Sequence, residues 1–455
     1  MGRGRAKVES SARPRHSAIG GVKELGRRPR VACLLLFASC LLPLAFTVTA
    51  HEPITTKVRF NKEIIRILQR SCLGCHHPGG IAMSLATYED ARPWAKAIKE
   101  EILEKRMPPW HAVKGYGEFR NAPPLAQREV DLIVNWVEGG APKGEDKDLP
   151  AGPLFSEDWP LGKPDMILRP ESETKVSPDA DDYHVFNLPT ALKEDRWMAA
   201  IDLRPGSGSV VHCATFYLVE VRGAVVGGHE KTDYNVGTQK FVGAIKLPPN
   251  SNPSPPALGP LLGTWMPGQK APLLPEGVAR LLPAGSRIAV RIHYRGSGEE
   301  AKDLSAVGLY FAKTPPRRRL QEIGISNSWA LIPSRAGLAQ VAADFTIKDD
   351  AEAFAIRPRA HPLMMSLQAT AYRPDGTQEV LIWSRGYQFD WQPTYYFKQP
   401  VSLPGATRVE VIAYFDNSDD NRNNPNSPAK PVRWADLTSD PMCALLIANG
   451  RGAND

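Results

Sequence analysis

Cysteine is scarce in this 455-residue sequence, which has six, and two of them, Cys33 and Cys40, lie in the first 50 residues. The others are Cys72, Cys75, Cys213 and Cys443. Because only one C-x-x-C pair exists, the chain lacks the second pair that a zinc site of four soft ligands needs. A redox-active C-x-x-C is expected near a strand–helix unit of thioredoxin type, and the flanking sequence offers none.

The sequence also lacks an excess of charge outside its first 50 residues. The chain has 56 Lys+Arg and 49 Asp+Glu, a net charge of +7. Residues 1–50 hold nine Lys/Arg and two Asp/Glu, which is the whole of this excess. The remainder is neutral overall, so the composition gives no reason to expect nucleic-acid binding.

One long apolar run is present, VACLLLFASCLLPLAFTVTA at residues 31–50. A basic segment precedes this run and small residues end it, which predicts a signal peptide over residues 1–50, cut after Ala50. The protein would then be periplasmic or otherwise exported. The alternative is an uncleaved membrane anchor, although the run is near the shortest length that spans a bilayer and contains Pro43.

The most specific pattern in the sequence is RSCLGCHHPGG at residues 70–80. In an exported protein, C-x-x-C-H predicts the covalent attachment of one haem c. Cys72 and Cys75 would form thioethers to the porphyrin, and His76 would be the proximal ligand of the iron.

Two amphipathic segments flank this motif. FNKEIIRILQRSC has apolar residues at helical spacing, with Asn61 as the expected N-cap. LAQREVDLIVNWVEGGAPKG repeats the spacing and stops at Gly139–Gly140, a signal for a helix end. Together they predict a small all-α cytochrome c domain over residues 51–148.

The sixth iron ligand is expected in the loop between these two helices. EKRMPPWHA offers Met107, and a thioether opposite a histidine raises the haem potential and suits electron transfer. Met83 and His111 compete for the same role. A further alternative is that Met107 only packs against the porphyrin.

The pattern changes after residue 148. Residues 149–180 are rich in Pro and Gly, which predicts a linker. Short β-rich runs such as GSVVHCATFYLVEV, SRIAVRIHYRG and RVEVIAYFDNS follow, separated by turns, which favours antiparallel sandwiches. Because about 270 residues is long for one sandwich, we expect two all-β domains, at residues 181–316 and 317–455.

Several motifs in this β half come in a recognisable order. They are VVHCATFYLVEVRG, LPEGVARLLPAGSRIAVRIHYRGSG, YRPDG, FDWQPTYY, LPGATRVEVIAYFDNSDDNRNNPN and SDPMCALL. As an ordered set they resemble the type II copper, ascorbate-dependent monooxygenases, the family of the peptidylglycine α-hydroxylating and dopamine β-monooxygenases. More closely, the chain looks like bacterial proteins that fuse a c-type cytochrome domain to such a module.

The resemblance covers nearly all of residues 57–450 and implies two jelly-roll-like domains, each with one copper. The first copper passes electrons and takes three histidines in this family. VVHC and IHY supply His212 and His293, while Cys213 stands at the third position. A thiolate with two histidines resembles an electron-transfer copper site. The alternatives for Cys213 are a buried strand residue or a disulfide with Cys443.

The second copper activates dioxygen in this family and takes two histidines and a methionine. His361 and Met442 match this pattern, but Arg359 stands where the other histidine is expected. A permanent positive charge beside the metal disfavours cation binding. The resemblance therefore implies between zero and two bound coppers.

Two functions follow from these patterns. The first is an exported haem c electron-transfer protein that feeds a copper monooxygenase-like module, which would hydroxylate a C–H bond of a small organic substrate with dioxygen. The second is a non-catalytic electron carrier whose β module is a degenerate scaffold for a partner or ligand. Both need a periplasmic electron donor, and a membrane partner is expected only if the leader is uncleaved. The retained ligands favour the first function, whereas Cys213 and Arg359 favour the second.

Overall fold

Most of the chain after residue 54 is described by the structure, a computed structural model. The described residues are 55–121, 125–152, 159–219, 245–247, 260–269, 273–327, 330–389, 391–433 and 443–452, with the backbone alone for 245–247 and 443–452. Residues 53–455 form one compact unit, and the predicted signal peptide lies outside the described residues. No helix in these ranges has the length and apolar character needed to cross a membrane.

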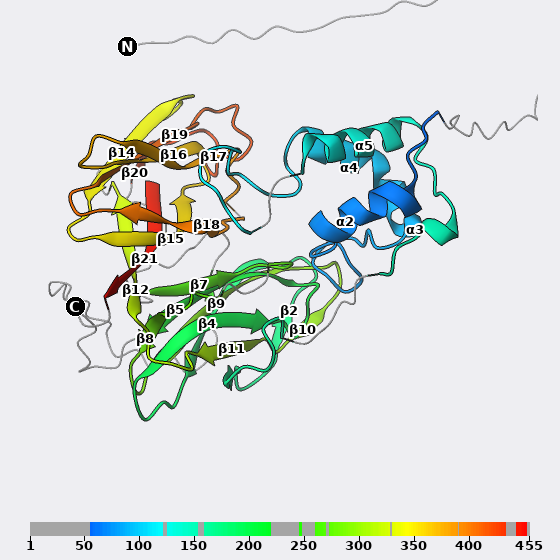
Figure 1. Cartoon of the computed structure of the whole chain (residues 1–455). Helices are drawn as coiled ribbons and strands as arrows, with labels where there is room; N and C mark the ends of the chain where they lie inside the picture. Colours follow the sequence, from blue (N-terminus) through cyan, green and yellow to red (C-terminus); the bar gives the residue numbers. More distant parts are fainter. Residues whose placement is uncertain are drawn as a thin grey trace, which may run out of the picture. The chain divides into compact units, whose positions relative to one another are not determined.

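All helices of the described residues lie between residues 60 and 148 (Figure 1). They are η2 (Phe60–Ile64), α2 (Ile65–Ser71), α3 (Tyr88–Ala91), η3 (Arg92–Trp94), α4 (Ala95–Leu103), α5 (Gln127–Glu138) and η4 (Asp146–Asp148). Their apolar sides share one core, in which the rings of Phe60 and Trp136 lie 5.9 Å apart. We call residues 55–109 and 125–148 the helical region.

The ends of these helices test two sequence predictions. Helix α5 ends at Glu138, directly before Gly139–Gly140, as predicted. Gly140 has a φ of 91°, a left-handed conformation that glycine adopts without a steric penalty. The prediction that Asn61 caps the first helix is wrong. Its side chain is buried and donates to the carbonyl of Glu145 at 3.1 Å, so it ties the helix to the segment after α5.

The first β region consists of two layers around one core, in which Phe216 and Val290 of one sheet meet Met198 and Leu309 of the other. The five-stranded sheet has the order β6 (Ile245–Leu247), β3 (Asp181–Pro189), β9 (Arg287–Arg295), β5 (Val211–Val219) and β7 (Leu261–Trp265). The opposing strands are, in order, β1 (Met166–Leu168), β11 (Ala306–Phe311), β4 (Arg196–Arg204) and β8 (Val278–Leu282). The short strands β2 (Thr174–Val176) and β10 (Ala301–Asp303) pair separately.

The second β region repeats this two-layer plan around a core that includes Ile356, Leu367 and Val411. One layer has the order β12 (Arg318–Ser326), β21 (Cys443–Gly452), β15 (Ala351–Ala360) and β18 (Tyr395–Leu403). The other has β14 (Ala339–Thr346), β19 (Arg408–Phe415), β16 (Met364–Tyr372) and β17 (Gln378–Arg385), and β13 (Leu331–Ile332) pairs with β20 (Val432–Arg433). A short parallel contact between β12 and β8 joins one layer of each region into an eight-stranded sheet.

The predicted all-β sandwich character of the chain after the helices is confirmed by these layers. The first β region, however, begins at Met166, inside the segment predicted as a linker, because β1 pairs with β11 and β2 pairs with β10. These strands have three residues each, which is too short to show an alternating pattern in the sequence.

Residues 110–121 leave the helical region and pack on the second β region; we call them the strap. The amide of Val113 donates to the carbonyl of Trp383 at 2.7 Å, and the amide of Arg120 donates to the carbonyl of Tyr396 at 2.8 Å. The ring of Trp110 lies 4.8 Å from that of Tyr395. Residues predicted for the cytochrome c domain thus belong in part to the core of the second β region.

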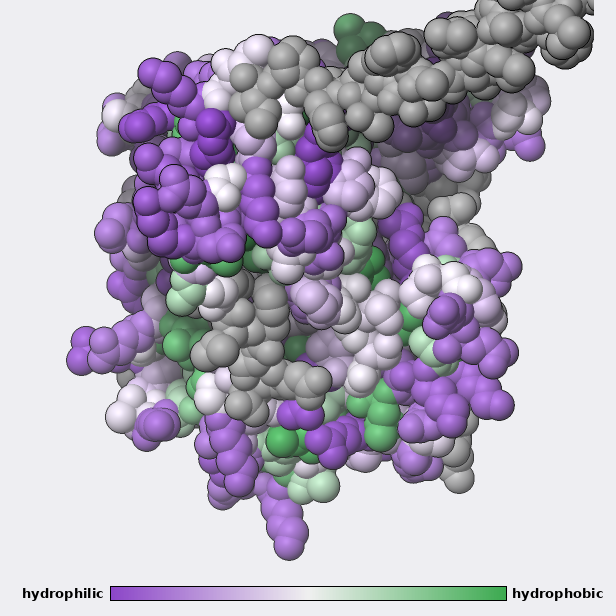
Figure 2. Space-filling view, turned by 90° about the vertical axis from the view of Figure 1, so that its right-hand side faces the viewer, coloured by the Kyte–Doolittle hydropathy of each residue, from purple (hydrophilic) through white to green (hydrophobic). Residues whose placement is uncertain are grey.

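The surface on the face drawn in Figure 2 is mostly hydrophilic, with small and separate apolar areas. Such a surface is typical of a protein that meets water over most of this face.

Candidate metal and haem sites

His212, Cys213 and His293 come together on the paired strands β5 and β9. In this pair, Val211 lies opposite Tyr294 and Cys213 lies opposite His293. Two steps along β5 therefore match one step along β9, so His212 is the extra residue of a β-bulge.

The bulge decides which side chains share a face of the five-stranded sheet. Ile292 and Tyr294 point into the core of the first β region, so His293 between them faces the other side. Cys213, its direct neighbour across the strands, lies on that side too. Because the bulge interrupts the alternation at His212, the histidine joins the cysteine there instead of pointing to the opposite face.

The three side chains offer a compact donor set. One nitrogen of His212, one nitrogen of His293 and the sulfur of Cys213 all lie within 4.8 Å of one another. A metal ion at about 2.0–2.3 Å from each donor requires donor separations of roughly 3–4.5 Å. Small side-chain rotations are enough to close this difference, so the cluster fits one metal ion.

The two imidazoles are oriented as metal ligands usually are. Nε2 of His293 lies 2.8 Å from Oδ1 of Asp181, and such a carboxylate contact on one ring nitrogen fixes the orientation of the other. Nδ1 of His212 is buried without a hydrogen-bond partner. Burial, together with the nearby His293 and Arg295, lowers the pKa of His212 to about 3. Its imidazole is thus neutral and keeps a lone pair for a metal.

Aromatic rings enclose the cluster. Tyr183 stacks on His293 with ring centroids 4.3 Å apart, and the ring of Trp391, from the second β region, lies 6.1 Å from that of His212. His293 is only 2% exposed. The two imidazoles are therefore shielded from bulk water, whereas Cys213 is partly exposed.

The C-x-x-C-H motif follows α2. Cys72 and Cys75 are not joined in a disulfide. Burial raises the pKa of Cys72 to about 12, with Cys75 adding to the shift, and burial raises the pKa of Cys75 to about 11. A redox-active C-x-x-C has a lowered thiol pKa, so these thiols do not fit the dithiol alternative.

The same residues fit a covalently bound haem. Nδ1 of His76 lies 3.0 Å from the carbonyl of Met83, which leaves Nε2 for an iron ion. Burial lowers the pKa of His76, so its imidazole is neutral. Four large apolar side chains of the helical region are exposed, as expected for a surface that a porphyrin would cover. They are Met83, Trp94, Leu103 and Met107.

The three candidates for the sixth iron ligand differ in their surroundings. Met107 and Met83 are each 41% exposed, so both sulfurs are accessible. His111 instead lies buried in the strap, where its amide donates to the hydroxyl of Tyr395 at 3.3 Å and its ring lies 6.4 Å from that of Tyr387. Its place in the core of the second β region leaves the two methionines as the better candidates.

The residues expected at the second copper do not form a comparable donor set. His361 and Arg359 lie at the end of β15 and are both buried. Nδ1 of His361 accepts a hydrogen bond from the amide of Leu363 at 3.3 Å. Met442 lies outside the described residues. Within the ranges that the structure describes, the only His/Cys/carboxylate group with metal-binding separations is His212, Cys213 and His293.

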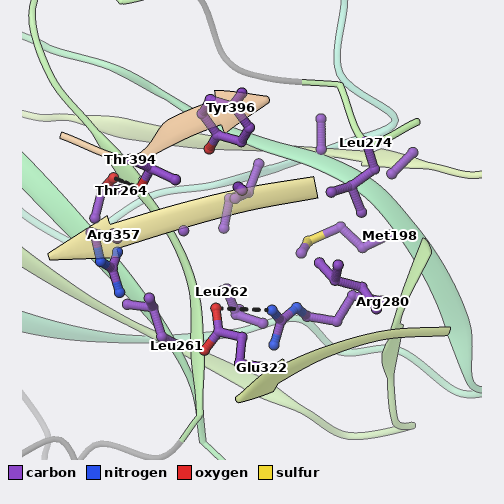
Figure 3. A pocket seen from close by; sticks show the side chains of 16 residues that line it. Met198, Leu261, Leu262, Thr264, Leu274, Arg280, Glu322, Arg357, Thr394 and Tyr396 are labelled. Carbon is purple, nitrogen blue, oxygen red and sulfur yellow. Dashed lines mark hydrogen bonds and ion pairs between the residues drawn. The ribbon is translucent and has the colours of Figure 1, made fainter. Parts of the chain in front are cut away.

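A cavity of about 70 Å³ lies between the two β regions, lined in part by Ala355 and Arg357 in the middle of β15 (Figure 3). Arg280 pairs with Glu322 at 3.3 Å across it, and Arg357 points two nitrogens without hydrogen-bond partners toward its interior. Burial, together with the charge of Arg359, lowers the pKa of Arg357 to about 10. The buried guanidinium group of Arg359, two residues before His361, disfavours a copper ion at His361.

The segment that carries the C-x-x-C-H motif lies against the loop before β5 and the loop after β7. Sγ of Cys75 lies 3.2 Å from the carbonyl of Pro267, just after β7. A Cβ added to Gly74 would lie 2.9 Å from Cα of Gly268, and a Cβ added to Gly208 would lie 2.8 Å from the carbonyl oxygen of Gly79. Gly208 lies three residues before Val211, the first residue of β5, and β7 pairs with β5 at Ala214, beside Cys213.

Some residues of these sites escape sequence reasoning. Asp181 lies in an acidic run, DADDYH, that reads as an ordinary turn, and only the register of β3 with β9 brings it to His293. Trp391 comes from the second β region. The need for glycine at positions 208 and 268 cannot be seen in the sequence, because it comes from the backbone of the C-x-x-C-H segment that packs against them.

No family model matches this chain, and no curated protein matches it. Among solved structures, the chain is similar to the major capsid protein P2 from bacteriophage PM2, with 12% identity and a TM-score of 0.25 over 63% of this chain and 97% of that one. A putative secreted protein from Eubacterium rectale is similar with 6% identity and a TM-score of 0.20 over 62% of this chain and 69% of that one. Similarities at this level carry no argument about function.

Proposed function

We propose that the protein is an exported electron-transfer protein that takes up electrons at a haem c and passes them to a metal ion held by His212, Cys213 and His293. Cys72, Cys75 and His76 would hold the haem, with Met107 or Met83 as the sixth iron ligand. The haem supplies one-electron redox chemistry when bound. A periplasmic donor would reduce it from outside.

The observation that supports this proposal best is the contact between the haem-binding motif and the loops beside the metal cluster. Electron transfer slows steeply as the gap between two redox centres widens. Two close backbone approaches, of Gly74 to Gly268 and of Gly79 to Gly208, hold the motif in place, and Sγ of Cys75 contacts the carbonyl of Pro267. Glycines on both sides let the two backbones approach more closely than any side chain would allow.

A substitution that adds a side chain between the two backbones, which we call the wedge, tests the proposal. Gly208→Val would place a side chain against the carbonyl of Gly79, whereas Gly337→Val adds a side chain at a site with nothing within 4 Å. Neither residue has a left-handed backbone, so neither change strains its own conformation. With the haem reduced and the metal oxidised under argon, reoxidation of the haem should be first order and independent of protein concentration.

We expect Gly208→Val to slow this reoxidation by at least about tenfold and Gly337→Val to leave it unchanged. Both variants should keep one covalent haem, as a denatured sample would reveal by its spectrum. Equal rates in the two variants, or a rate that rises with protein concentration, would contradict intramolecular transfer through this contact.

Hydroxylation of a C–H bond is the second candidate function, and the described residues support it less. A dioxygen-activating copper needs its own donors, and Arg359 brings a buried positive charge to the position where the second histidine is expected. We therefore propose a non-catalytic electron carrier and not a monooxygenase. Dioxygen uptake coupled to the formation of an oxygenated product would instead favour monooxygenase activity.

A further inference from the structure

We propose that His212, Cys213 and His293 bind a single copper ion through two imidazole nitrogens and the thiolate of Cys213. The proposal deepens the proposed function, because it names the metal that takes up the electrons. It also gives Cys213 a ligand role, although cysteine replaces the histidine that the resemblance implies at this position.

The main objection to such a site is that neighbouring residues on a strand point to opposite faces. The bulge at His212 removes this objection. It adds a residue to β5 where the strand passes His293, so that His212 and Cys213 can both present a donor on the outer side of the sheet.

The donor set favours copper over other common metals. Structural zinc sites almost always have four protein ligands, and this cluster brings three His and Cys donors together in the described part of the chain. Catalytic zinc sites also use three protein ligands, so copper is favoured over zinc by its affinity and not by the number of donors. Two histidines and a cysteine are the trigonal set of electron-transfer copper sites, and copper binds nitrogen and sulfur donors more tightly than zinc does.

The surroundings of the cluster suit a one-electron metal. Asp181 holds the ring of His293, and Tyr183 stacks on the same ring, so this ligand keeps its orientation when the charge of the metal changes. Trp391 shields the side of His212. A rigid, shielded site limits the rearrangement that accompanies each change of oxidation state, which favours electron transfer over substrate binding.

X-ray absorption at the copper edge tests the proposal, because it reports on copper alone and is blind to the haem iron. The haem-loaded protein is stripped with a chelator, titrated with Cu(II) and measured. We expect one copper per haem, with one sulfur neighbour and two or three nitrogen neighbours. Cys213→His should keep the copper and lose the sulfur neighbour, since it restores an all-imidazole set.

Cys443→Ala is the matched control, because Cys443 is the one other cysteine that neither the haem nor the predicted leader takes up. Its copper should keep the sulfur neighbour. A copper with nitrogen neighbours alone, a sulfur neighbour that survives in Cys213→His, or a site that takes up zinc and rejects copper would each overturn the proposal.

These outcomes can be told apart from those of the Gly208→Val experiment. If the sulfur neighbour is absent while the wedge still slows haem reoxidation, the electron-transfer function stands and the thiolate site falls. If the sulfur neighbour is present while the wedge has no effect, the thiolate site stands and the transfer route falls.

Discussion

The two β regions share a plan but differ in where each one interrupts its strand pairing. In the first, the bulge of β5 falls on His212, itself a donor, and gathers two neighbouring residues onto one face. In the second, β15 also shifts register, but at Phe354, an apolar residue that packs with Val278 and Leu320. Both regions have further register shifts, but only the one at His212 falls on a residue of the candidate metal cluster of the described residues.

A second difference lies in the buried polar residue that organises the loops of each region. In the first, the carboxylate of Asp303 accepts hydrogen bonds from the amides of Gly206, Ser207 and Ser305 and from the hydroxyl of Tyr294. In the second, the amide of Asn417 donates to two carbonyls and accepts from Asn424. One region thus needs an acceptor where the other needs a donor.

Exchanging the carboxylate of Asp303 and the amide of Asn417 for each other's side-chain type should cause the largest loss of stability. Asp303→Asn places an amide against four donors, and Asn417→Asp places a carboxylate against two carbonyls. Each change leaves buried groups unsatisfied, so we expect each to lower the free energy of unfolding by about 3 kcal/mol or more. Urea unfolding at pH 7 measures this loss.

The two exchanges should also differ in their pH dependence. A carboxyl group at position 417 can donate once it is protonated, so Asn417→Asp should recover part of its stability below pH 5, whereas Asp303→Asn should not. Exposed Asp179 provides the control, because Asp179→Asn should leave unfolding unchanged. A loss at Asp303 no larger than at Asp179 would refute the organising role of this residue.

The second largest effect should be on the pH dependence of stability, because each region has one buried titratable group and the two groups act with opposite sign. Burial lowers the pKa of His111, in the strap on the second region, to about 4. The unfolded chain binds this proton near pH 6.5, so the free energy of unfolding should fall by about 2–3 kcal/mol between about pH 6.5 and 4. His111→Gln should remove this part of the slope in urea titrations across that range.

Asp202 in the first region should act with the opposite sign. Burial raises its pKa to about 6, so the folded protein binds a proton that the unfolded chain binds only near pH 4. Its contribution to stability therefore rises as pH falls from about 6 to 4. Asp202→Asn should stabilise the protein at pH 7 by about 1–3 kcal/mol, and a loss there would contradict the assignment.

The smallest effect should be on the copper affinity of the His212–Cys213–His293 cluster, which only the first region has. Asp181→Ala removes the carboxylate that holds Nε2 of His293, and loss of such a partner lowers metal affinity by about 10–100-fold. Copper affinity measured by competition with a chelator should show this drop. Asp179→Ala, in the same loop but without a contact to the cluster, should bind copper as the parent does.

The sequence predicted the elements that depend on local pattern. The end of α5 before Gly139 follows from a glycine signal, and the layered strands follow from short alternating runs. The resemblance also paired His212 with His293, and the structure places them on adjacent strands. The joint position of Cys213 and His212 could not be predicted, because VVHCATF contains no glycine or other residue that marks a bulge.

The strap was missed for a related reason. Its contacts are backbone hydrogen bonds to strands about 270 residues further along the chain, and no local pattern encodes a partner at that distance. His111 consequently looked like a candidate iron ligand beside Met107, whereas the strap carries it into another core.

The strap has a consequence for how this chain is made and divided. Residues 110–121 are synthesised early, but the strands that receive Trp110 and Phe119 emerge from the ribosome only near the end of translation. A fragment cut at residue 148 would therefore expose two aromatic side chains to water and offer an unpaired edge to other chains. The strap joins the segment that carries the C-x-x-C-H motif to strands that are made last, so the two parts are best handled as a single folding unit.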